Sequence, residues 1–302
     1  MKNKHTIIIP NIAEDERIGR SFSYLIDVLA KTEASDYVVW DFKHVSFLHP
    51  FFLAPLAIYK ETCGKIIECV NISLRLQSFL NAVCFDRMLH FNNDSKEDVQ
   101  SVIAKYLNKS FFPLCSFAMT DSNKDSFGSL IQHVITKQTG AERGESSLSY
   151  LISELLDNIY EHSQSPNGYV YSQYIESEKM IYLCVADTGI TIPGSYRKAK
   201  RFQKEIDGSD VEALKLANDG YSTKNRPEAE NRGYGISTSK EMLVNGMKGA
   251  FYMISGGAFH RYENGANGYV ALSDIFFWKG TLVLLKIPAH LPADFNYIDY
   301  LE

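Results

Sequence analysis

An acidic and an amide side chain stand four residues apart in the segment 146–162, SSLSYLISELLDNIYEH. Residues at this spacing project from the same side of a helix, so Glu154 and Asn158 would lie next to each other. The carboxamide oxygen of Asn158 is a suitable ligand for Mg²⁺, which prefers hard oxygen donors. Glu154 could accept a proton from a water or hydroxyl that attacks a γ-phosphate. Taken alone, the pair is more typical of the polar face of an ordinary amphipathic helix.

A second candidate is the carboxylate in the sequence VADTGITIP, at 185–193. An apolar, β-branched strand would deliver Asp187 at its end, and Gly189 would follow in a turn. A buried carboxylate there could accept a hydrogen bond from the exocyclic amine of adenine, and a glycine would leave space for the base. Taken alone, the pattern is more typical of an ordinary Asp-x-Gly turn.

Two glycines precede a predicted helix in the sequence NRGYGISTSKEM. Gly233 and Gly235 would leave backbone N–H groups free to face phosphate oxygens at the helix N-terminus. The polar segment before them contains Lys224, which could also reach a phosphate, and its composition suggests a movable lid. A lone Gly-x-Gly is a weak signal, and a flexible turn is its usual explanation.

Periodic segments would have to hold these residues in place. The segment 146–162 has an apolar stripe that would pack on a sheet, formed by Leu148, Leu151, Ile152, Leu155 and Ile159. Around it the sequence predicts helices at 127–139 and 235–245, a β-hairpin at 168–176 and 179–186, and a late strand at 280–287. The first 105 residues instead alternate strands at 6–9, 37–42 and 65–71 with helices at 17–30, 53–61 and 76–84, which favours a small α/β domain.

The order of the motifs carries more information than any one of them. Along the chain come a helix with Glu-x-x-x-Asn, a strand with Asp-x-Gly, a polar segment with Ser-Thr-Lys, Gly-x-Gly before a helix, and Gly-Thr opening a late strand. This series resembles the N box, the G1 box, the lid with the G2 box, and the GT strand of the GHKL family (gyrase, Hsp90, histidine kinase, MutL). The resemblance spans roughly 126–288. It implies a C-terminal α/β sandwich with a mixed sheet that binds ATP and Mg²⁺.

The resemblance also implies roles for individual residues. Glu154 corresponds to the general base and Asn158 to the Mg²⁺ ligand. Asp187 corresponds to the residue that recognises adenine, with Gly189 beside the base. Thr281 is expected near Asp187, where it would support the adenine through water.

The phosphate end of the site is expected to be formed by Gly233 and Gly235, with Lys224 as a further phosphate contact. Tyr234 stands between the two glycines and departs from the family pattern; its ring would either cover the nucleotide or pack against the lid. The region 195–219 is longer than expected and rich in Lys and Arg. We interpret that region as a solvated helical lid.

The N-terminal part resembles a second family. The sequence DFKHVSFLHPFFLAPLAIYK is similar to the central strand, turn and helix of STAS domains, the fold of anti-sigma-factor antagonists, and FLNAVCFDRMLHF is similar to their closing helix. Asp41 matches the end of the family's strand. The position that is phosphorylated in the family falls at about Pro50 or Phe51, and neither residue has a hydroxyl. An unrelated small α/β domain is the alternative.

We therefore expect a STAS-like α/β domain at 1–105, a linker at 106–125, a GHKL ATP-binding domain at 126–291 and a C-terminal tail at 292–302. The segment 105–124 lacks clear periodicity and ends in polar turn formers, which places the junction there.

Composition excludes several classes of protein. A net charge of −5 argues against a general nucleic-acid binder. The five cysteines form no CxxC pair and no cluster with histidine, which favours reduced thiols over a zinc site. The most apolar stretch, 47–59, is interrupted by two prolines and is shorter than the ~20 residues of a membrane span. We expect a cytoplasmic protein without membrane segments.

Two functions are compatible with these features. One is a signalling ATPase or serine/threonine protein kinase of the anti-sigma-factor type, which acts on a regulatory protein partner. The STAS-like part would then be a docking or dimerisation module, and a homodimer is one arrangement it allows. The alternative is an ATP-gated interaction module without phosphotransfer, in which nucleotide closes the lid and changes the exposed partner surface.

Overall fold

The computed structural model describes residues 4–12, 18–91, 99, 101–102, 104–139, 145–221, 223, 234–272 and 274–300. The contacts within the chain divide it into two compact units. The N-terminal unit comprises Met1–Leu89 with Pro113–Cys115, and the C-terminal unit comprises His90–Phe112 with Ser116–Glu302.

The N-terminal unit contains a parallel three-stranded sheet in the order β1-β2-β3. Its elements are β1 (His5–Ile8), α1 (Ile18–Glu33), β2 (Tyr37–Asp41), α2 (Pro50–Thr62), β3 (Ile66–Val70) and α3 (Leu74–Ala82). Parallel neighbours need a crossover connection, and α1 and α2 supply the two that are required. α1 buries one face through Phe22, Leu25, Ile26 and Leu29, whereas α2 is buried all along 50–59 because it is apolar on every side.

The C-terminal unit is built on an eight-stranded sheet in the order β10-β9-β8-β11-β7-β6-β5-β4. The strands are β4 (Leu89–Phe91), β5 (Phe111–Ala118), β6 (Asn167–Ile175), β7 (Met180–Asp187), β8 (Ala250–Gly256), β9 (Ala258–Glu263), β10 (Ala266–Ala271) and β11 (Trp278–Pro288). The ladders from β6 to β10 are antiparallel. β11 therefore lies between β7 and β8 although it comes last in the chain.

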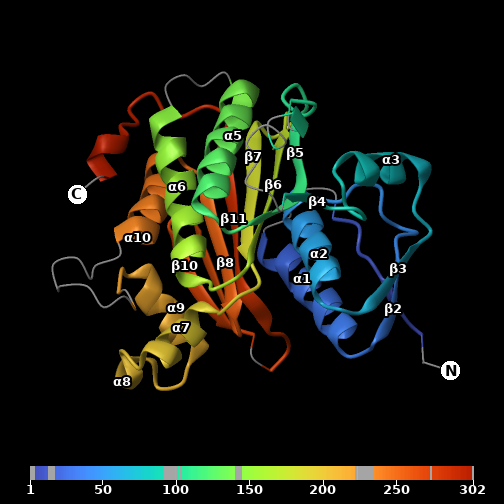
Figure 1. Ribbon diagram of the computed structural model, residues 1–302, viewed down its shortest axis with the longest axis horizontal. Coiled ribbons are helices and arrows are strands. Elements are labelled where there is room, and N and C mark those ends of the chain that lie inside the picture. Colours follow the sequence, from blue (N-terminus) through green and yellow to red (C-terminus); the bar gives the residue numbers. More distant parts are fainter. Residues whose placement is uncertain are drawn as a thin grey trace. The chain divides into compact units, whose positions relative to one another are not determined.

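The same unit contains helices, the longest of which lie over one face of the sheet (Figure 1). They are α5 (Asp121–Thr139), α6 (Glu145–His162), α7 (Ile192–Ala199), α8 (Gln203–Ile206), α9 (Asp210–Asn218) and α10 (Tyr234–Glu241). A π-helical turn, Met242–Gly246, follows α10, and a 3₁₀ turn, Tyr297–Tyr300, lies near the C-terminus. The predicted stripe of α6 is buried, with Leu151 and Ile152 fully inaccessible. α5 is held to α6 by an ion pair of 2.6 Å between Lys124 Nζ and Asp157 Oδ1.

The predicted fold class is confirmed: a C-terminal α/β sandwich with a mixed sheet, preceded in the chain by a small α/β domain. The segment 106–125, which we expect to be a linker, contains β5 and the first residues of α5. All five cysteines are free, with Cys115 and Cys184 buried and the other three half-buried. None of the helices in the described part of the chain is long and apolar enough to cross a membrane.

Candidate functional site

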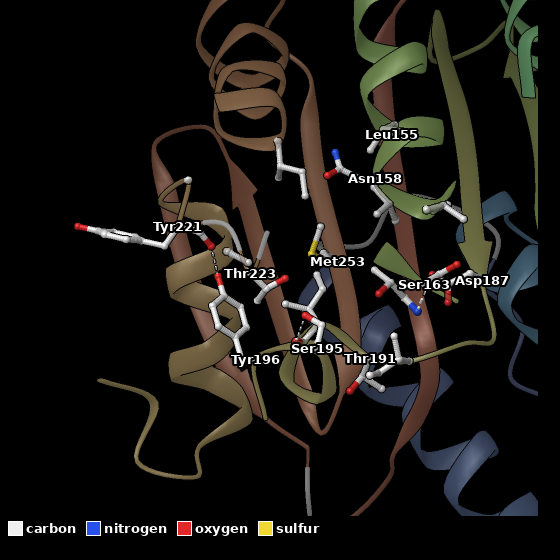
Figure 2. A pocket seen from close by; sticks show the side chains of 18 residues that line it. Leu155, Asn158, Ser163, Asp187, Thr191, Ser195, Tyr196, Tyr221, Thr223 and Met253 are labelled. Atoms are coloured by element: carbon white, nitrogen blue, oxygen red, sulfur yellow. Dashed lines mark hydrogen bonds between the residues drawn. The ribbon is translucent and has the colours of Figure 1, made fainter. Parts of the chain in front are cut away.

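A cavity of about 100 Å³ lies in the C-terminal unit (Figure 2). Its walls come from α6 and the loop after it, the end of β7, the helices α7, α9 and α10, the segment between α9 and α10, and the strands β8 and β11. Ten of the 18 lining residues are aliphatic, methionine or tyrosine: Leu155, Ile159, Ile190, Ile192, Tyr196, Ala217, Tyr221, Ile236, Met253 and Val283. A largely apolar cavity with a few fixed polar groups is typical of a site for a flat organic ligand.

Asp187 lines the cavity and is deeply buried, with 1% of its surface exposed. Its Oδ1 accepts a hydrogen bond from Gly189 N at 2.8 Å, and its Oδ2 accepts one from Thr281 N at 3.2 Å. Burial raises the pKa of this carboxyl to about 7, while the two backbone N–H groups oppose the rise. The carboxyl therefore titrates near neutral pH, and in its ionised form it offers only acceptor atoms.

Two glycines let the backbone approach Asp187 and its neighbours closely. Gly280 has a φ of +80°, and a Cβ there would lie 2.3 Å from Asp187 O. A Cβ at Gly189 would lie 2.0 Å from the backbone oxygen of Ser163, which also accepts a hydrogen bond from Ile190 N at 2.6 Å. Both positions therefore require glycine for reasons of packing.

Ser255 lies behind this group, on β8 opposite Thr281 of β11. It is fully buried, and its Oγ lies 3.0 Å from Thr281 Oγ1. The same Oγ donates to Gly280 O at 2.9 Å and accepts from Ile192 N at 2.8 Å. One hydroxyl thus joins β8 and β11 to the first residue of α7.

Asn158 lines the cavity from α6, as Figure 2 shows. Its Nδ2 donates to the backbone oxygen of Glu154 at 2.6 Å, which leaves Oδ1 as the atom that can bind a ligand. Glu154 is half-buried one helical turn earlier and is not among the residues that line the cavity. No cluster of three or more His, Cys, Asp or Glu occurs among the described residues.

The region 192–218 folds into three helices, α7 to α9, which we call the lid helices. They share a small core of Tyr196, Ile206 and Ala213, against which Phe202 and Leu216 pack. Tyr196 is 1% exposed and lines the cavity, and its hydroxyl donates to the backbone oxygen of Tyr221. The expectation of a helical region is confirmed, but its inner face is buried.

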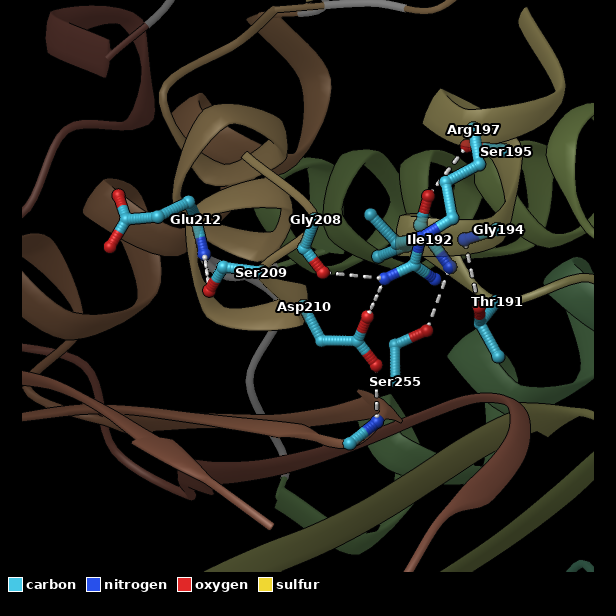
Figure 3. A network of polar contacts seen from close by, with 11 residues as sticks. Thr191, Ile192, Gly194, Ser195, Arg197, Gly208, Ser209, Asp210, Glu212 and Ser255 are labelled. Atoms are coloured by element: carbon cyan, nitrogen blue, oxygen red, sulfur yellow. Dashed lines mark hydrogen bonds and ion pairs between the residues drawn. The ribbon is translucent and has the colours of Figure 1, made fainter. Parts of the chain in front are cut away.

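A polar network fixes the lid helices to the sheet (Figure 3). Arg197 of α7 donates to Gly208 O at 3.1 Å and pairs with Asp210 at the start of α9. The other carboxylate oxygen of Asp210 accepts from Gly257 N, in the turn between β8 and β9, at 2.7 Å. At the opposite end, Lys240 of α10 donates to Asn218 O at 3.2 Å.

Residues 144–288 match the family described as histidine kinase-, DNA gyrase B-, and HSP90-like ATPases. These residues form a GHKL ATPase domain. The match runs from before α6 to the end of β11 and therefore includes every residue that lines the cavity. No curated protein matches the chain in sequence.

Of the site residues predicted in the GHKL domain, the structure brings Asn158, Asp187 and Thr281 to one cavity. Glu154 and Gly189 are adjacent to these residues but do not line it. Lys224 and Gly233 lie outside the described residues. Tyr234 and Gly235 form the first turn of α10, but their side-chain surroundings are also outside the described part. The predicted phosphate contacts of all four residues stay predictions.

Sequence reasoning missed several residues that shape the GHKL cavity. Tyr196 and Ser195 belong to the region whose role we could not predict, and Met253 belongs to a uniformly apolar strand. Ser255 carries no local signal, because only the pairing of β8 with β11 places it beside Thr281. A helical spacing of apolar residues in 192–217 could have indicated that one face of this region is buried.

Proposed function

We propose that the protein binds ATP with Mg²⁺ in this cavity and acts as a signalling ATPase or serine/threonine protein kinase on a protein partner. One observation carries the proposal: a buried carboxylate, Asp187, closes an apolar cavity within a GHKL domain. An apolar cavity with a buried carboxylate suits the flat, weakly polar face and the exocyclic amine of adenine.

The adenine end would be held by Asp187 and Thr281. The ionised Asp187 would accept a hydrogen bond from the exocyclic amine, and the Thr281 hydroxyl would support the base through water. Apolar contacts from Leu155, Ile159 and Met253 would cover the faces of the ring. Gly189 would keep the backbone beside the base tightly packed on Ser163.

The phosphate end would lie between α6 and the start of α10. Asn158 Oδ1 would be the protein ligand of Mg²⁺, which takes its other ligands from phosphate oxygens and water. Gly233 and Gly235, with the N-terminus of α10, would hold the phosphates, and Lys224 would add a positive charge. Bound Mg²⁺ would neutralise the charge that develops on the phosphates.

Glu154 would act as the general base. It stands one helical turn before Asn158, so its carboxylate projects from the side of α6 that carries the Mg²⁺ ligand. Its half-buried position leaves it accessible to a water or a partner hydroxyl that approaches the γ-phosphate. Attack by water gives ATP hydrolysis, and attack by a partner serine or threonine gives protein phosphorylation.

The N-terminal unit would serve as a STAS-like docking or dimerisation module. Strand β2 of its parallel sheet ends at Asp41. The Oδ1 atom of Asp41 accepts hydrogen bonds from Asn71 Nδ2 at 2.9 Å and from Lys43 N at 3.0 Å. Pro50 begins α2 and Phe51 follows it, so the predicted acceptor position has no hydroxyl. The phosphoryl acceptor would therefore be on another protein, and a homodimer would be one arrangement of this module.

The lid helices favour a second candidate, an ATP-gated interaction module without phosphotransfer. Ile192, Ser195, Tyr196 and Ala217 all contribute to the cavity from this region. Because the lid helices form part of the cavity wall, a bound nucleotide would contact them and affect their position. A ligand that favours one lid position would change the surface that partners meet.

Substitution of Glu154 by Ala separates the two functions. With radiolabelled γ-phosphate, wild-type protein is expected to release phosphate or to label a partner serine or threonine, and Glu154→Ala should do neither. Glu161→Ala, an exposed change on the same helix, is the matched control and should keep the activity. If Glu154→Ala keeps an ATP-dependent change in size or partner binding, the gating function is supported and phosphotransfer is not the main function.

A further inference from the structure

The buried hydroxyl of Ser255 has a complete set of hydrogen-bond partners within 3.0 Å. They are Gly280 O at 2.9 Å, Ile192 N at 2.8 Å and Thr281 Oγ1 at 3.0 Å. A serine hydroxyl has one hydrogen to donate and two lone pairs that accept. The three contacts therefore use its whole capacity.

The direction of each bond follows from the chemistry of the partners. Gly280 O is a carbonyl and can only accept, so it receives the Ser255 hydrogen. The pairing of β11 with β8 is irregular between Trp278 and Thr281, and Gly280 is not paired with a β8 residue there. Ile192 N can only donate, so it takes one lone pair of Ser255. The remaining lone pair must face Thr281, and Thr281 is therefore the donor in that contact.

This assignment fixes the hydrogen of the Thr281 hydroxyl. The hydrogen points back toward Ser255, away from the cavity that Thr281 lines. Thr281 Oγ1 is then left with lone pairs only. The neighbouring Asp187 carboxylate also offers only lone pairs when it is ionised. Together, Asp187 and Thr281 form a wall that accepts hydrogen bonds and donates none.

We propose that Ser255 is a positioning residue that gives the site its preference for a purine with an amine at position 6. It acts through Thr281 and does not itself line the cavity. An amine at position 6 has two hydrogens and can donate to Asp187 directly and toward Thr281 through the bridging water, whereas a carbonyl oxygen at position 6 has no hydrogen to give to either acceptor. This inference rests on the proposed binding of ATP in the cavity.

The test compares ATP with inosine triphosphate, which differs from ATP only in the 6-position group and the N1 proton that goes with it. The comparison is made at pH 8, where most of Asp187 is ionised. Wild-type protein is then expected to bind ATP roughly 10- to 100-fold more tightly than inosine triphosphate. In Ser255→Ala, the Thr281 hydroxyl is free to turn its hydrogen toward a carbonyl at position 6. The preference should then fall by roughly fivefold or more.

Two further variants distinguish this effect from a general loss of structure. Ser172→Ala also removes a fully buried serine hydroxyl, on β6, and should leave the preference unchanged. Thr281→Val removes the acceptor itself, so it should lower the preference by a similar factor, and adding Ser255→Ala to it should have no further effect. Thermal melting of each variant checks folding. If Ser255→Ala does not fold, Thr281→Val alone provides the test.

The outcomes separate the inference from the proposed function. Failure of wild-type protein to bind ATP defeats the proposed function, and the inference with it. Binding of ATP without preference over inosine triphosphate leaves the function intact and overturns the inference. An unchanged preference in Ser255→Ala, or in Thr281→Val where the first variant does not fold, overturns it as well.

Discussion

The pH dependence of ATP binding should follow the ionisation of Asp187. Burial raises the pKa of this carboxyl to about 7, against 3.8 for an exposed aspartate. The adenine amine donates a hydrogen bond, so the ionised carboxyl is the form that binds it. Acidification below pH 7 should therefore weaken binding, because a growing share of the free protein has a proton on the acceptor.

The size of the effect follows from the fraction of protein that is ionised. With a pKa of about 7, roughly nine-tenths of Asp187 is ionised at pH 8 and roughly one-tenth at pH 6. Apparent affinity scales with the competent fraction, so it should fall about tenfold between these values, or about 1.4 kcal/mol. An ordinary exposed aspartate would stay ionised across this interval and would give no change.

The assay is calorimetric titration with ATP at pH 6, 7 and 8 for wild-type protein and Asp187→Asn. ATP itself changes charge in this interval, but it does so for both proteins. The ratio of their Kd values therefore isolates Asp187. We expect Asp187→Asn to lose about tenfold more affinity relative to wild type at pH 8 than at pH 6. A ratio that does not vary with pH would refute the reasoning.

The raised pKa of Asp187 should also make the free energy of unfolding fall as the pH rises. Because its pKa is higher in the folded protein, the folded state binds a proton more tightly than the unfolded state between pH 4 and pH 7. The stabilisation is complete below pH 4 and is lost as the pH rises through 7. A pKa that moves from 3.8 to about 7 corresponds to about 4 kcal/mol. Urea unfolding at several pH values should show this loss in wild-type protein and not in Asp187→Asn. If the free energy of unfolding depends on pH in the same way in both proteins, the prediction is wrong.

Further substitutions test other parts of the account. Asn158→Ala should remove the Mg²⁺ dependence of ATP binding while melting remains normal; retained dependence would place the metal elsewhere. Gly189→Ala places a Cβ 2.0 Å from a backbone oxygen and should lower the free energy of unfolding by about 1–3 kcal/mol. Gly128→Ala, whose Cβ would meet only a leucine side chain at 3.4 Å, is its control, and equal losses would be inconsistent with the packing argument. Asp210→Ala should cost about 2 kcal/mol in urea unfolding because it leaves a backbone N–H without its acceptor, whereas Arg197→Ala should cost under about 1 kcal/mol because that side chain is 43% exposed. A larger loss in Arg197→Ala would mean that the ion pair, and not the backbone contact, holds the lid helices.

Local periodicity was sufficient to predict the elements that carry the motifs: α6, the β6–β7 hairpin, α10 and β11. The apolar stripe of α6 predicted both the helix and its buried face, and the apolar and aromatic runs on either side of residue 177 predicted the β6–β7 hairpin. The position of Asp187 at the end of β7 followed from that hairpin. β5 was not predicted: its run FFPLCSFA contains Pro113, which is disfavoured inside a strand.

The parts of the site that sequence could not predict depend on contacts between distant segments. Ser255 reaches Thr281 only because β11 is inserted between β7 and β8. The buried face of the lid helices depends on Tyr196, Ile206 and Ala213 meeting across three short helices. Gly189 was interpreted as space for a base, while its closest constraint is the backbone oxygen of Ser163, from the loop that follows α6. Such proximity has no signature in local spacing.

The central claim is that Asp187 recognises ATP in the cavity of the GHKL domain. Its most direct test is calorimetric titration at pH 8 with ATP and ADP, with and without Mg²⁺, for wild-type protein and Asp187→Asn. We predict saturable, Mg²⁺-sensitive binding to wild-type protein and an affinity roughly 5- to 150-fold lower in the variant, which corresponds to about 1–3 kcal/mol. Equal affinity in the two proteins, or no binding to wild-type protein at millimolar nucleotide, would contradict the account.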